Sequence, residues 1–183
     1  MEIVQNSERI LIKIVQNFEE ILIKRYMQGR KRNRKLDFDY SSEAIYFVTI
    51  CTQNRVHYFG KVESGKMNLS NFGKVAYEKC IWLENQYPYV EIHNFIIMPN
   101  HIHILFEINK INKEVKRKSI SSLIGAYKTL VSKEIHLLGN IDFSWQRSFH
   151  DHIVRTENRY ENIYNYITNN PENWKKDQFY ENN

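Results

Sequence analysis

The sequence contains little cysteine, proline or glycine. Its 183 residues include two cysteines, three prolines and six glycines. Cys51 and Cys80 lie far apart and form no Cys-x-x-Cys pair, which excludes a disulfide framework and a cysteine-rich zinc module. So little glycine and proline excludes collagen-like and low-complexity chains. A chain of this length buries roughly 70% of its unfolded surface, so a hydrophobic core can stabilise it without such cross-links.

Long hydrophobic runs are also missing. Near the N-terminus, charged residues interrupt the apolar segment before it reaches the ~20 apolar residues that a membrane span requires: Glu8, Arg9, Lys13, Glu19 and Glu20. No small-residue cleavage site follows, so the segment does not look like a signal peptide. We expect a soluble, cytoplasmic protein that has no membrane partner.

Residues 3–13 and 14–24 form a tandem repeat of eleven residues, which differs only at Ser7/Phe18 and Arg9/Glu20. Eleven residues make almost three helical turns, so the repeated apolar positions stay on one side of a helix. We therefore predict an amphipathic helix over residues 1–26, appended to a domain over residues 27–183. This helix could mediate dimerisation or simply lie on the surface, and both a monomer and a homodimer remain open.

Positive charge is clustered along the chain, although the formal net charge is only +5. Seven basic residues and no acidic one lie between Lys24 and Lys35, and the stretch from Lys110 to Lys118 has five basic residues and one acidic one. Basic clusters attract polyanions, and tyrosine rings can stack on unpaired bases. We expect the first cluster to bind DNA phosphates through Arg30, Lys31, Arg32, Arg34 and Lys35. A solvated arm without a specific role is the alternative.

The pattern of apolar residues predicts one α+β domain. Strands are predicted over Ala44–Cys51, Val90–Ile97 and His101–Ile108 and around residues 148–155. Helices are predicted from a cap at Ser70 or Asn71 to Tyr87-Pro88, from Ser119 onward, and from about Glu157 to Asn170. A turn-rich stretch through Gly60 and Gly65 precedes the first of these helices. The order is that of a ferredoxin-like (RRM-like) antiparallel sheet with two helices on one face and an added C-terminal helix.

A His-x-His motif, His101-Ile102-His103, lies in the third predicted strand. Because side chains alternate along a strand, both imidazoles share one face of the sheet. Two histidines at this spacing can bind one metal ion, whereas solvent-facing histidines are the ordinary interpretation of a lone His-x-His. His150-Asp151-His152 has the same spacing. Spacing alone therefore does not choose between the two motifs.

The residues around the first motif resemble a known family. Residues 95–103 (FIIMPNHIH) resemble the His-hydrophobic-His signature of the HUH single-strand nucleases. The chain is similar, more specifically, to the REP-associated tyrosine transposases, small single-tyrosine HUH transposases of the IS200-like family that act on palindromic repeats. Further stretches agree in order: residues 46–52, 58–60, 145–147, 151–155 and 166–171. The resemblance spans roughly residues 30–176 and leaves residues 1–26 without a role.

This resemblance implies a DNA endonuclease and strand transferase that acts in transposition and recombination. By position, Tyr166 matches the nucleophile, and His101, His103 and Asn170 match the ligands of Mg²⁺ or Mn²⁺. Asn170 stands where insertion-sequence relatives usually have Gln. It follows Tyr166 by one helical turn, on the same helix face, and its alternative role is to cap the helix before Pro171.

In such enzymes the tyrosine attacks single-stranded or hairpin DNA, leaving a 5′-phosphotyrosine link and a free 3′ hydroxyl. No nucleotide cofactor is needed, and the chain has no Gly-rich phosphate loop. Lys128 matches a basic position of the family, and we expect Lys128 and Arg155 to contact DNA. Ordinary structural roles are the alternative for both. The resemblance also implies a nucleoid-associated location.

Two other classes of function remain open. A non-catalytic protein that binds single-stranded or hairpin DNA could use the same sheet. A zinc hydrolase would use both His-x-His motifs, but no His-Glu-x-x-His motif supplies its base. Within the last helix, Tyr160 and Tyr164 rival Tyr166 as nucleophile. Tyr160 belongs to the apolar stripe, and Tyr164 lies too far around the helix to share the face of Asn170.

Overall fold

The computed structural model describes residues 43–109 and 117–180. Three sequence predictions lie outside these residues: the appended helix over residues 1–26, the domain boundary after it, and the basic residues from Arg30 to Lys35. They remain predictions.

The domain is built on a four-stranded antiparallel sheet. Its strands are β1 (Ala44–Cys51), β4 (Val90–Ile97), β5 (His101–Ile108) and β6 (His150–Val154), in the spatial order β4-β5-β1-β6. The sheet strands have the positions that the apolar runs predict. A tight turn joins β4 to β5, where the Met98 amide donates to the His101 carbonyl at 2.8 Å. The two apolar runs on either side of Pro99 are therefore neighbouring strands, as predicted.

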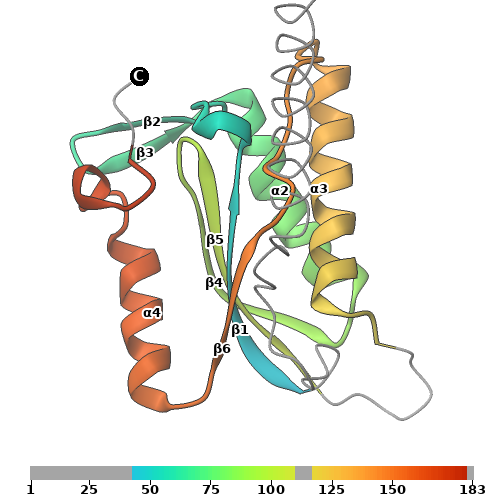
Figure 1. Cartoon of the computed structure of the whole chain (residues 1–183), viewed down its shortest axis with the longest axis vertical. Coiled ribbons are helices and arrows are strands. Elements are labelled where there is room, and N and C mark those ends of the chain that lie inside the picture. The colour runs from blue at the N-terminus through green and yellow to red at the C-terminus, as the bar shows by residue number, and fades with distance from the viewer. Residues whose placement is uncertain (1–42, 110–116, 181–183) are drawn as a thin grey trace, which may run out of the picture. The chain divides into compact units, whose positions relative to one another are not determined.

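Three helices cover the two faces of this sheet. The helices α2 (Asn71–Gln86) and α3 (Ile120–Leu137) lie on one face, and α4 (Glu157–Asn169) lies on the other (Figure 1). Side-chain oxygens cap each helix, since Ser70, Ser119 and Thr156 each accept a hydrogen bond from the backbone amide three residues later. This is the ferredoxin-like arrangement with an added C-terminal helix that the sequence predicts.

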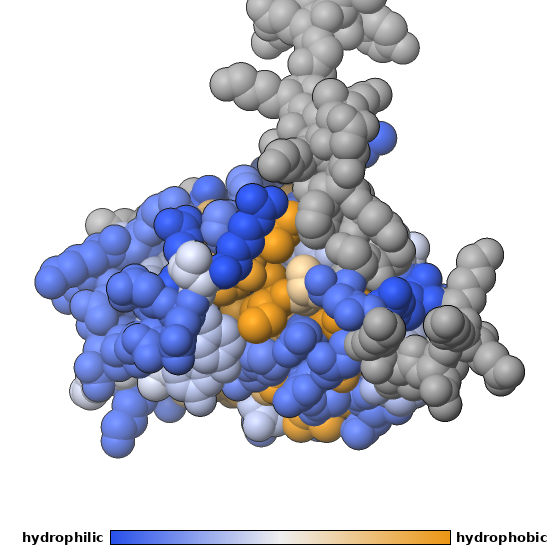
Figure 2. All heavy atoms as spheres, turned by 90° about the horizontal axis from the view of Figure 1, so that it is seen from below, coloured by the Kyte–Doolittle hydropathy of each residue, from blue (hydrophilic) through white to orange (hydrophobic). Residues whose placement is uncertain are grey.

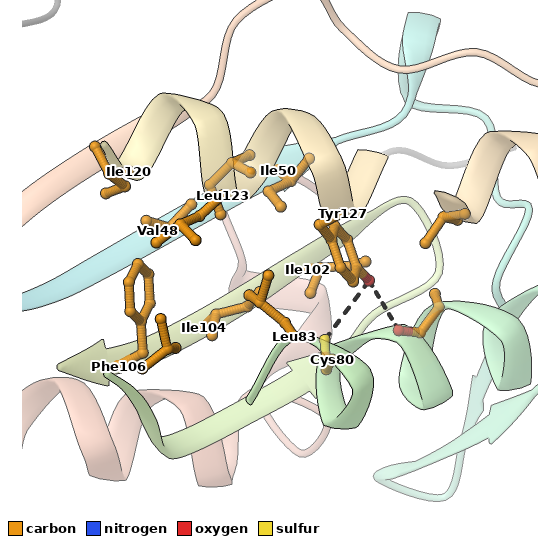
Figure 3. Close-up of a cluster of buried hydrophobic side chains, with 14 of the residues drawn as sticks. Val48, Ile50, Cys80, Leu83, Ile102, Ile104, Phe106, Ile120, Leu123 and Tyr127 are labelled. Carbon is orange, nitrogen blue, oxygen red and sulfur yellow. Dashed lines mark hydrogen bonds between the residues drawn. The ribbon is translucent and has the colours of Figure 1, made fainter. Parts of the chain in front are cut away.

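The main hydrophobic core lies between the sheet and the pair α2 and α3. Alternate residues of the central strands project into it, among them Val48 and Ile50 from β1 and Ile102 from β5 (Figure 3). The Tyr127 hydroxyl is buried there and donates to the Ala76 carbonyl at 2.9 Å, so this polar atom is satisfied. The core holds β1 and β5 rigidly, and these strands carry the candidate site on their other face.

A smaller apolar cluster attaches α4 to the opposite face of the sheet. Ile163 and Ile167 of α4 pack there with Leu105 of β5 and Val154 of β6. The molecular surface on the side of α4 is mainly hydrophilic, whereas hydrophobic residues gather toward the middle of the view from below (Figure 2). Because α4 uses a narrow apolar stripe, part of this sheet face remains available for polar residues.

One supersecondary element was not predicted from the sequence. The turn-rich stretch before α2 contains a hairpin of β2 (Gly60–Glu63) and β3 (Lys66–Leu69), which form their own two-stranded sheet. Ser64 and Gly65 form its turn with φ of 50° and 72°. Primed hairpin turns require such positive φ values. The short 3₁₀ turns η1 (Gln53–Arg55) and η2 (Trp174–Lys176) follow β1 and α4.

None of the helices in the described part of the chain combines the length and the apolar character that crossing a membrane would need.

Two helical glycines give a matched test of this packing. A Cβ at Gly73, in the first turn of α2, would lie 2.1 Å from the Phe59 carbonyl oxygen, whereas one at Gly125 of α3 would meet nothing within 4 Å. We expect Gly73→Ala to lower the free energy of unfolding by about 1–3 kcal/mol through overpacking. Gly125→Ala should raise it by about 0.5–1 kcal/mol through helix propensity. Urea unfolding of both variants measures the difference, and equal effects would contradict the close approach of α2 to Phe59.

Candidate active site

His101 and His103 lie on the face of β5 that is turned away from the main core. They are 0% and 1% exposed, and their Nε2 atoms are 3.1 Å apart. Burial lowers the pKa of His101 well below its usual value, and burial lowers the pKa of His103 to about 4. Both rings are therefore neutral at physiological pH, which is the form of imidazole that binds metal ions.

The other ring nitrogens fix the orientation of the two imidazoles. Asn100 donates through Nδ2 to the Phe179 carbonyl at 2.9 Å, so its Oδ1 faces Nδ1 of His101, at 2.8 Å. A carbonyl oxygen only accepts, so Nδ1 of His101 carries the proton and Nε2 keeps a lone pair. Nδ1 of His103 contacts the Thr49 hydroxyl at 2.9 Å, and a hydroxyl can donate or accept. His103 can therefore also present a lone pair at Nε2.

Tyr166 brings a phenol to this pair of histidines. Its hydroxyl lies 3.2 Å from Nε2 of His103, and its ring packs edge-on against Phe47 at 6.2 Å. The residue is 38% exposed, so a large substrate can approach it from solvent. Burial of the hydroxyl, together with the nearby Asp177 carboxylate, raises the pKa of Tyr166. The phenol is therefore protonated at physiological pH.

Asn170 completes the group from the C-terminal end of α4. It is 1% exposed, and its Nδ2 donates to Oδ2 of Asp177 at 2.7 Å. Its Oδ1 is buried without a hydrogen-bond partner among the residues that the structure describes, which is costly for a polar atom. Asn170 is also the C-cap residue of α4, where its backbone amide donates to the Ile167 carbonyl, so its backbone ends the helix while its side chain bonds Asp177. The orphaned oxygen is a suitable ligand for a divalent cation. Two neutral imidazoles and this amide oxygen are thus a donor set that fits the expected metal.

Asp177 belongs to the site, although the sequence analysis does not identify it. It lies just after η2, and its Oδ2 accepts hydrogen bonds from the Tyr166 hydroxyl and from Asn170, both at 2.7 Å. His101, His103 and Asp177 each offer a ligand atom, and these atoms all lie within 4.8 Å of one another. No motif or periodicity marks Asp177 in the sequence. It meets the histidines because the segment after α4 folds back over His101.

Aromatic contacts hold this returning segment against the histidine pair. The rings of Trp174 and Phe179 lie 5.8 Å and 4.7 Å from the ring of His101, and both residues are largely buried. They cover His101 and exclude water from it. The lowered pKa values of the histidines follow from this cover.

The second His-x-His motif lies beside the site. His150 and His152 are on the edge strand β6, where they pair with Thr49 and Phe47 of β1. Both are exposed, and they line a cavity of about 330 Å³. Within the described part of the chain, neither belongs to a group of three potential metal ligands. The two motifs have the same spacing, but they differ in burial and in the side chains that they contact.

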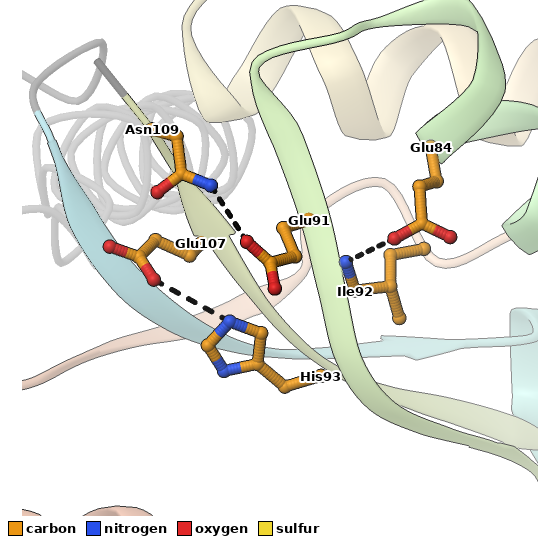
Figure 4. A network of polar contacts seen from close by, with 6 residues as sticks. All are labelled: Glu84, Glu91, Ile92, His93, Glu107 and Asn109. Carbon is orange, nitrogen blue, oxygen red and sulfur yellow. Dashed lines mark hydrogen bonds and ion pairs between the residues drawn. The ribbon is translucent and has the colours of Figure 1, made fainter.

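The rival tyrosines of α4 lie elsewhere. The ring of Tyr160 packs against His93 at 5.5 Å and against Tyr164 at 6.1 Å. His93 forms a second group of potential ligands with Glu91 and Glu107, in which it pairs with Glu107 (Figure 4). Asn109 donates a hydrogen bond to Glu91, and the Ile92 amide donates one to Glu84. Glu91 is exposed, and these contacts tie the edge strand β4 to its neighbours. Of the three tyrosines, Tyr166 is the one whose hydroxyl contacts His103.

The structure does not bring the predicted DNA-binding residues Lys128 and Arg155 into this group. Nζ of Lys128 donates to the carbonyl of Gln146 at 2.6 Å, and burial lowers its pKa. Lys128 thus holds the segment that leads to β6, which is a structural role. Arg155 is exposed directly after β6. Contact of either residue with DNA stays a prediction.

The chain is similar to known proteins in sequence and in fold. A protein from Haemophilus influenzae (strain ATCC 51907 / DSM 11121 / KW20 / Rd) that carries no functional name is 32% identical over 169 residues, which covers 82% of this chain and 93% of that protein. Among solved structures, a REP-associated tyrosine transposase bound to a REP hairpin superposes with a TM-score of 0.57 at 20% identity, over 77% of this chain and 74% of the other. This likeness supports the fold.

Membership of a family follows from the sequence match. Residues 40–170 match the family described as "Transposase IS200 like". The matched segment runs from just before β1 to Asn170, so it contains the two histidines and Tyr166. The chain therefore belongs to the IS200-like transposase family, whose members are enzymes that act on DNA.

Proposed function

We propose that the protein is a metal-dependent tyrosine transposase that cleaves and rejoins single-stranded DNA at hairpins or palindromic repeats. One observation carries the proposal: the Tyr166 hydroxyl lies 3.2 Å from Nε2 of His103, which itself lies 3.1 Å from Nε2 of His101. A nucleophile thus meets two neutral imidazoles that face the same point. The hairpin bound to the REP-associated transposase of similar fold supports hairpin DNA as the substrate.

His101, His103 and Asn170 would hold Mg²⁺ or Mn²⁺. Two neutral nitrogens and one amide oxygen suit a divalent ion, and within residues 43–109 and 117–180 the buried Oδ1 of Asn170 has no hydrogen-bond partner. When bound, the ion would polarise the scissile phosphate as a Lewis acid. The protein itself keeps both imidazoles neutral by burial and holds them through Asn100 and Thr49.

Tyr166 supplies the covalent chemistry. Its phenol oxygen attacks phosphorus, the bond from phosphorus to the 3′ oxygen breaks, and the 5′ end of the DNA remains on the tyrosine. The free 3′ hydroxyl of a DNA strand can later attack this phosphotyrosine and rejoin the strand. No nucleotide is consumed, because the phosphodiester energy is kept in the covalent link.

A non-catalytic DNA-binding protein is the alternative from another class. Such a protein would need basic and aromatic surface residues, and it would need neither neutral buried histidines nor a phenol beside them. A zinc hydrolase with four histidines loses support, since His150 and His152 are exposed and lie outside the group around His103. The buried constellation thus favours an enzyme with a tyrosine nucleophile.

Tyr166→Phe tests the reaction class, because it removes the attacking oxygen and keeps the ring that packs against Phe47. With single-stranded hairpin DNA and Mn²⁺ or Mg²⁺, the parent protein should form an adduct that survives denaturant and carries the DNA 5′ end. The variant should form none, while its affinity for the hairpin stays within about threefold. Gel electrophoresis of labelled DNA and peptide mapping measure both results.

Tyr164→Phe is the matched control on the same helix, and it should leave the adduct intact. Cleavage by the parent without any adduct would instead indicate that water is the nucleophile. An adduct on Tyr160 or Tyr164 would keep the reaction class and refute the assignment to Tyr166.

His101→Ala and His103→Ala test the metal site independently of cleavage. Each removes one imidazole ligand, so the dissociation constant for Mn²⁺ should rise at least tenfold. Mutation of a residue that only supports a ligand already costs about this much metal affinity. Titration calorimetry on the DNA-free protein measures it. His150→Ala is the control with the same residue change and should bind Mn²⁺ like the parent. If His150→Ala loses Mn²⁺ and His101→Ala does not, the wrong motif has been assigned.

A further inference from the structure

We infer that Asp177 is the general base of the reaction and takes the proton of Tyr166 as the phenol attacks phosphorus. The inference rests on the proposed function and adds a catalytic residue to it. The hydroxyl of Tyr166 donates to Oδ2 of Asp177 at 2.7 Å. This distance is within the range that a general base needs to the atom that it deprotonates.

The proton has to leave Tyr166 during the attack rather than before it. A tyrosine phenol has an ordinary pKa of ~10 and is neutral at physiological pH, and the hydroxyl of Tyr166 donates its proton to a carboxylate. Tyr166 therefore waits as a neutral phenol, which is a poor nucleophile. A nucleophile of this kind requires an adjacent base that accepts its proton while the new bond forms.

Within the described part of the chain, two possible proton acceptors contact the Tyr166 hydroxyl, and one of them is used by the proposed metal site. Nε2 of His103 lies at 3.2 Å, but the proposed metal site uses the lone pair of this atom. Oδ2 of Asp177 is closer, at 2.7 Å, and it carries negative charge. The carboxylate is thus the acceptor that remains when the metal is bound.

Asp177 is also held in position by its own partners. Asn170 donates to the same Oδ2 at 2.7 Å, and the Phe179 amide donates to Oδ1 at 2.7 Å. The backbone amide of Asp177 bonds the Trp174 carbonyl at 3.0 Å, and the rings of Trp174 and Phe179 pack on His101. Tyr166 as nucleophile, Asp177 as base and Asn170 as the group that orients the base form an arrangement that other enzymes with a nucleophilic side chain also use.

The proton moves to Asp177 while bonds are exchanged at phosphorus. The phenol oxygen forms a bond to phosphorus, and its proton passes to Oδ2 of Asp177. The bond from phosphorus to the 3′ oxygen breaks, and this oxygen takes a proton from water, while Asp177 returns its proton to water. Before rejoining, Asp177 takes up a proton from water again and then gives it to the leaving phenolate, while the attacking 3′ hydroxyl releases its own proton to water. Asp177 therefore acts in both directions, because the reverse reaction passes through the same transition state.

Asp177→Asn is the central test, since it keeps the size of the side chain and removes its basicity. In single-turnover experiments on the full chain, adduct formation on Tyr166 and rejoining should both slow by about 10²–10⁴-fold. The Mn²⁺ and hairpin dissociation constants should stay within about threefold of the parent values. Glu172→Gln is the matched control, because Glu172 is an exposed carboxylate in the same segment, and it should react at the parent rate.

Chemical rescue separates proton transfer from positioning. Asp177→Gly leaves space for a small carboxylate, so added formate should restore adduct formation in proportion to its concentration. Formate should have no effect on Tyr166→Phe, which has no nucleophile to activate. Asp177→Glu retains a carboxylate and should recover part of the activity, so the test does not depend on the folding of one variant.

Several outcomes would overturn the inference. An adduct that forms on Tyr166 at the parent rate in Asp177→Asn would remove Asp177 from the chemistry and leave the proposed function intact. A Mn²⁺ dissociation constant raised at least tenfold in that variant would make Asp177 a metal ligand instead. Slow reaction without rescue by formate or Glu would make it a positioning residue. No adduct on Tyr166 in the parent protein would refute the proposed function itself.

Discussion

Side chains alternate along β5 between the main core and the candidate site, and this alternation fixes where the site lies. Ile102 and Ile104 point into the core beneath α2 and α3, so His101 and His103 must point to the opposite face. A slip of one residue in the pairing of β1 and β5 would exchange the two sets and bury the imidazoles in the apolar core. The core thus sets the register, and the register places the site.

Burial by a segment distant in sequence then gives the histidines their chemical character. Trp174 and Phe179 cover His101, and this cover keeps the imidazoles neutral. The same segment brings the carboxylate of Asp177 to the Tyr166 hydroxyl. The strand β5 therefore contributes two imidazoles, the helix α4 contributes a phenol and an amide, and the returning segment contributes a carboxylate.

Regular elements could be predicted from the sequence with good accuracy, and irregular ones could not. The apolar runs of β4 and β5 mark these strands in full, and Ser70 and Ser119 mark the starts of helices. The β2–β3 hairpin is hard to predict because each strand has only four residues and carries charged or polar side chains between the few apolar ones, of which Met67 and Leu69 pack against the main core. A turn through Ser64 and Gly65 by itself does not reveal that its flanks pair.

Two relations could be predicted from the residues alone: the two histidines share one strand face, and Tyr166 and Asn170 lie one helical turn apart. Both follow from the local repeat of the backbone. Folding of the whole domain was needed to show which His-x-His motif is buried, which tyrosine contacts it, and that Asp177 joins the group. Those facts depend on packing between segments more than fifty residues apart or on a chain reversal without regular structure. Neither leaves a periodic pattern in the sequence.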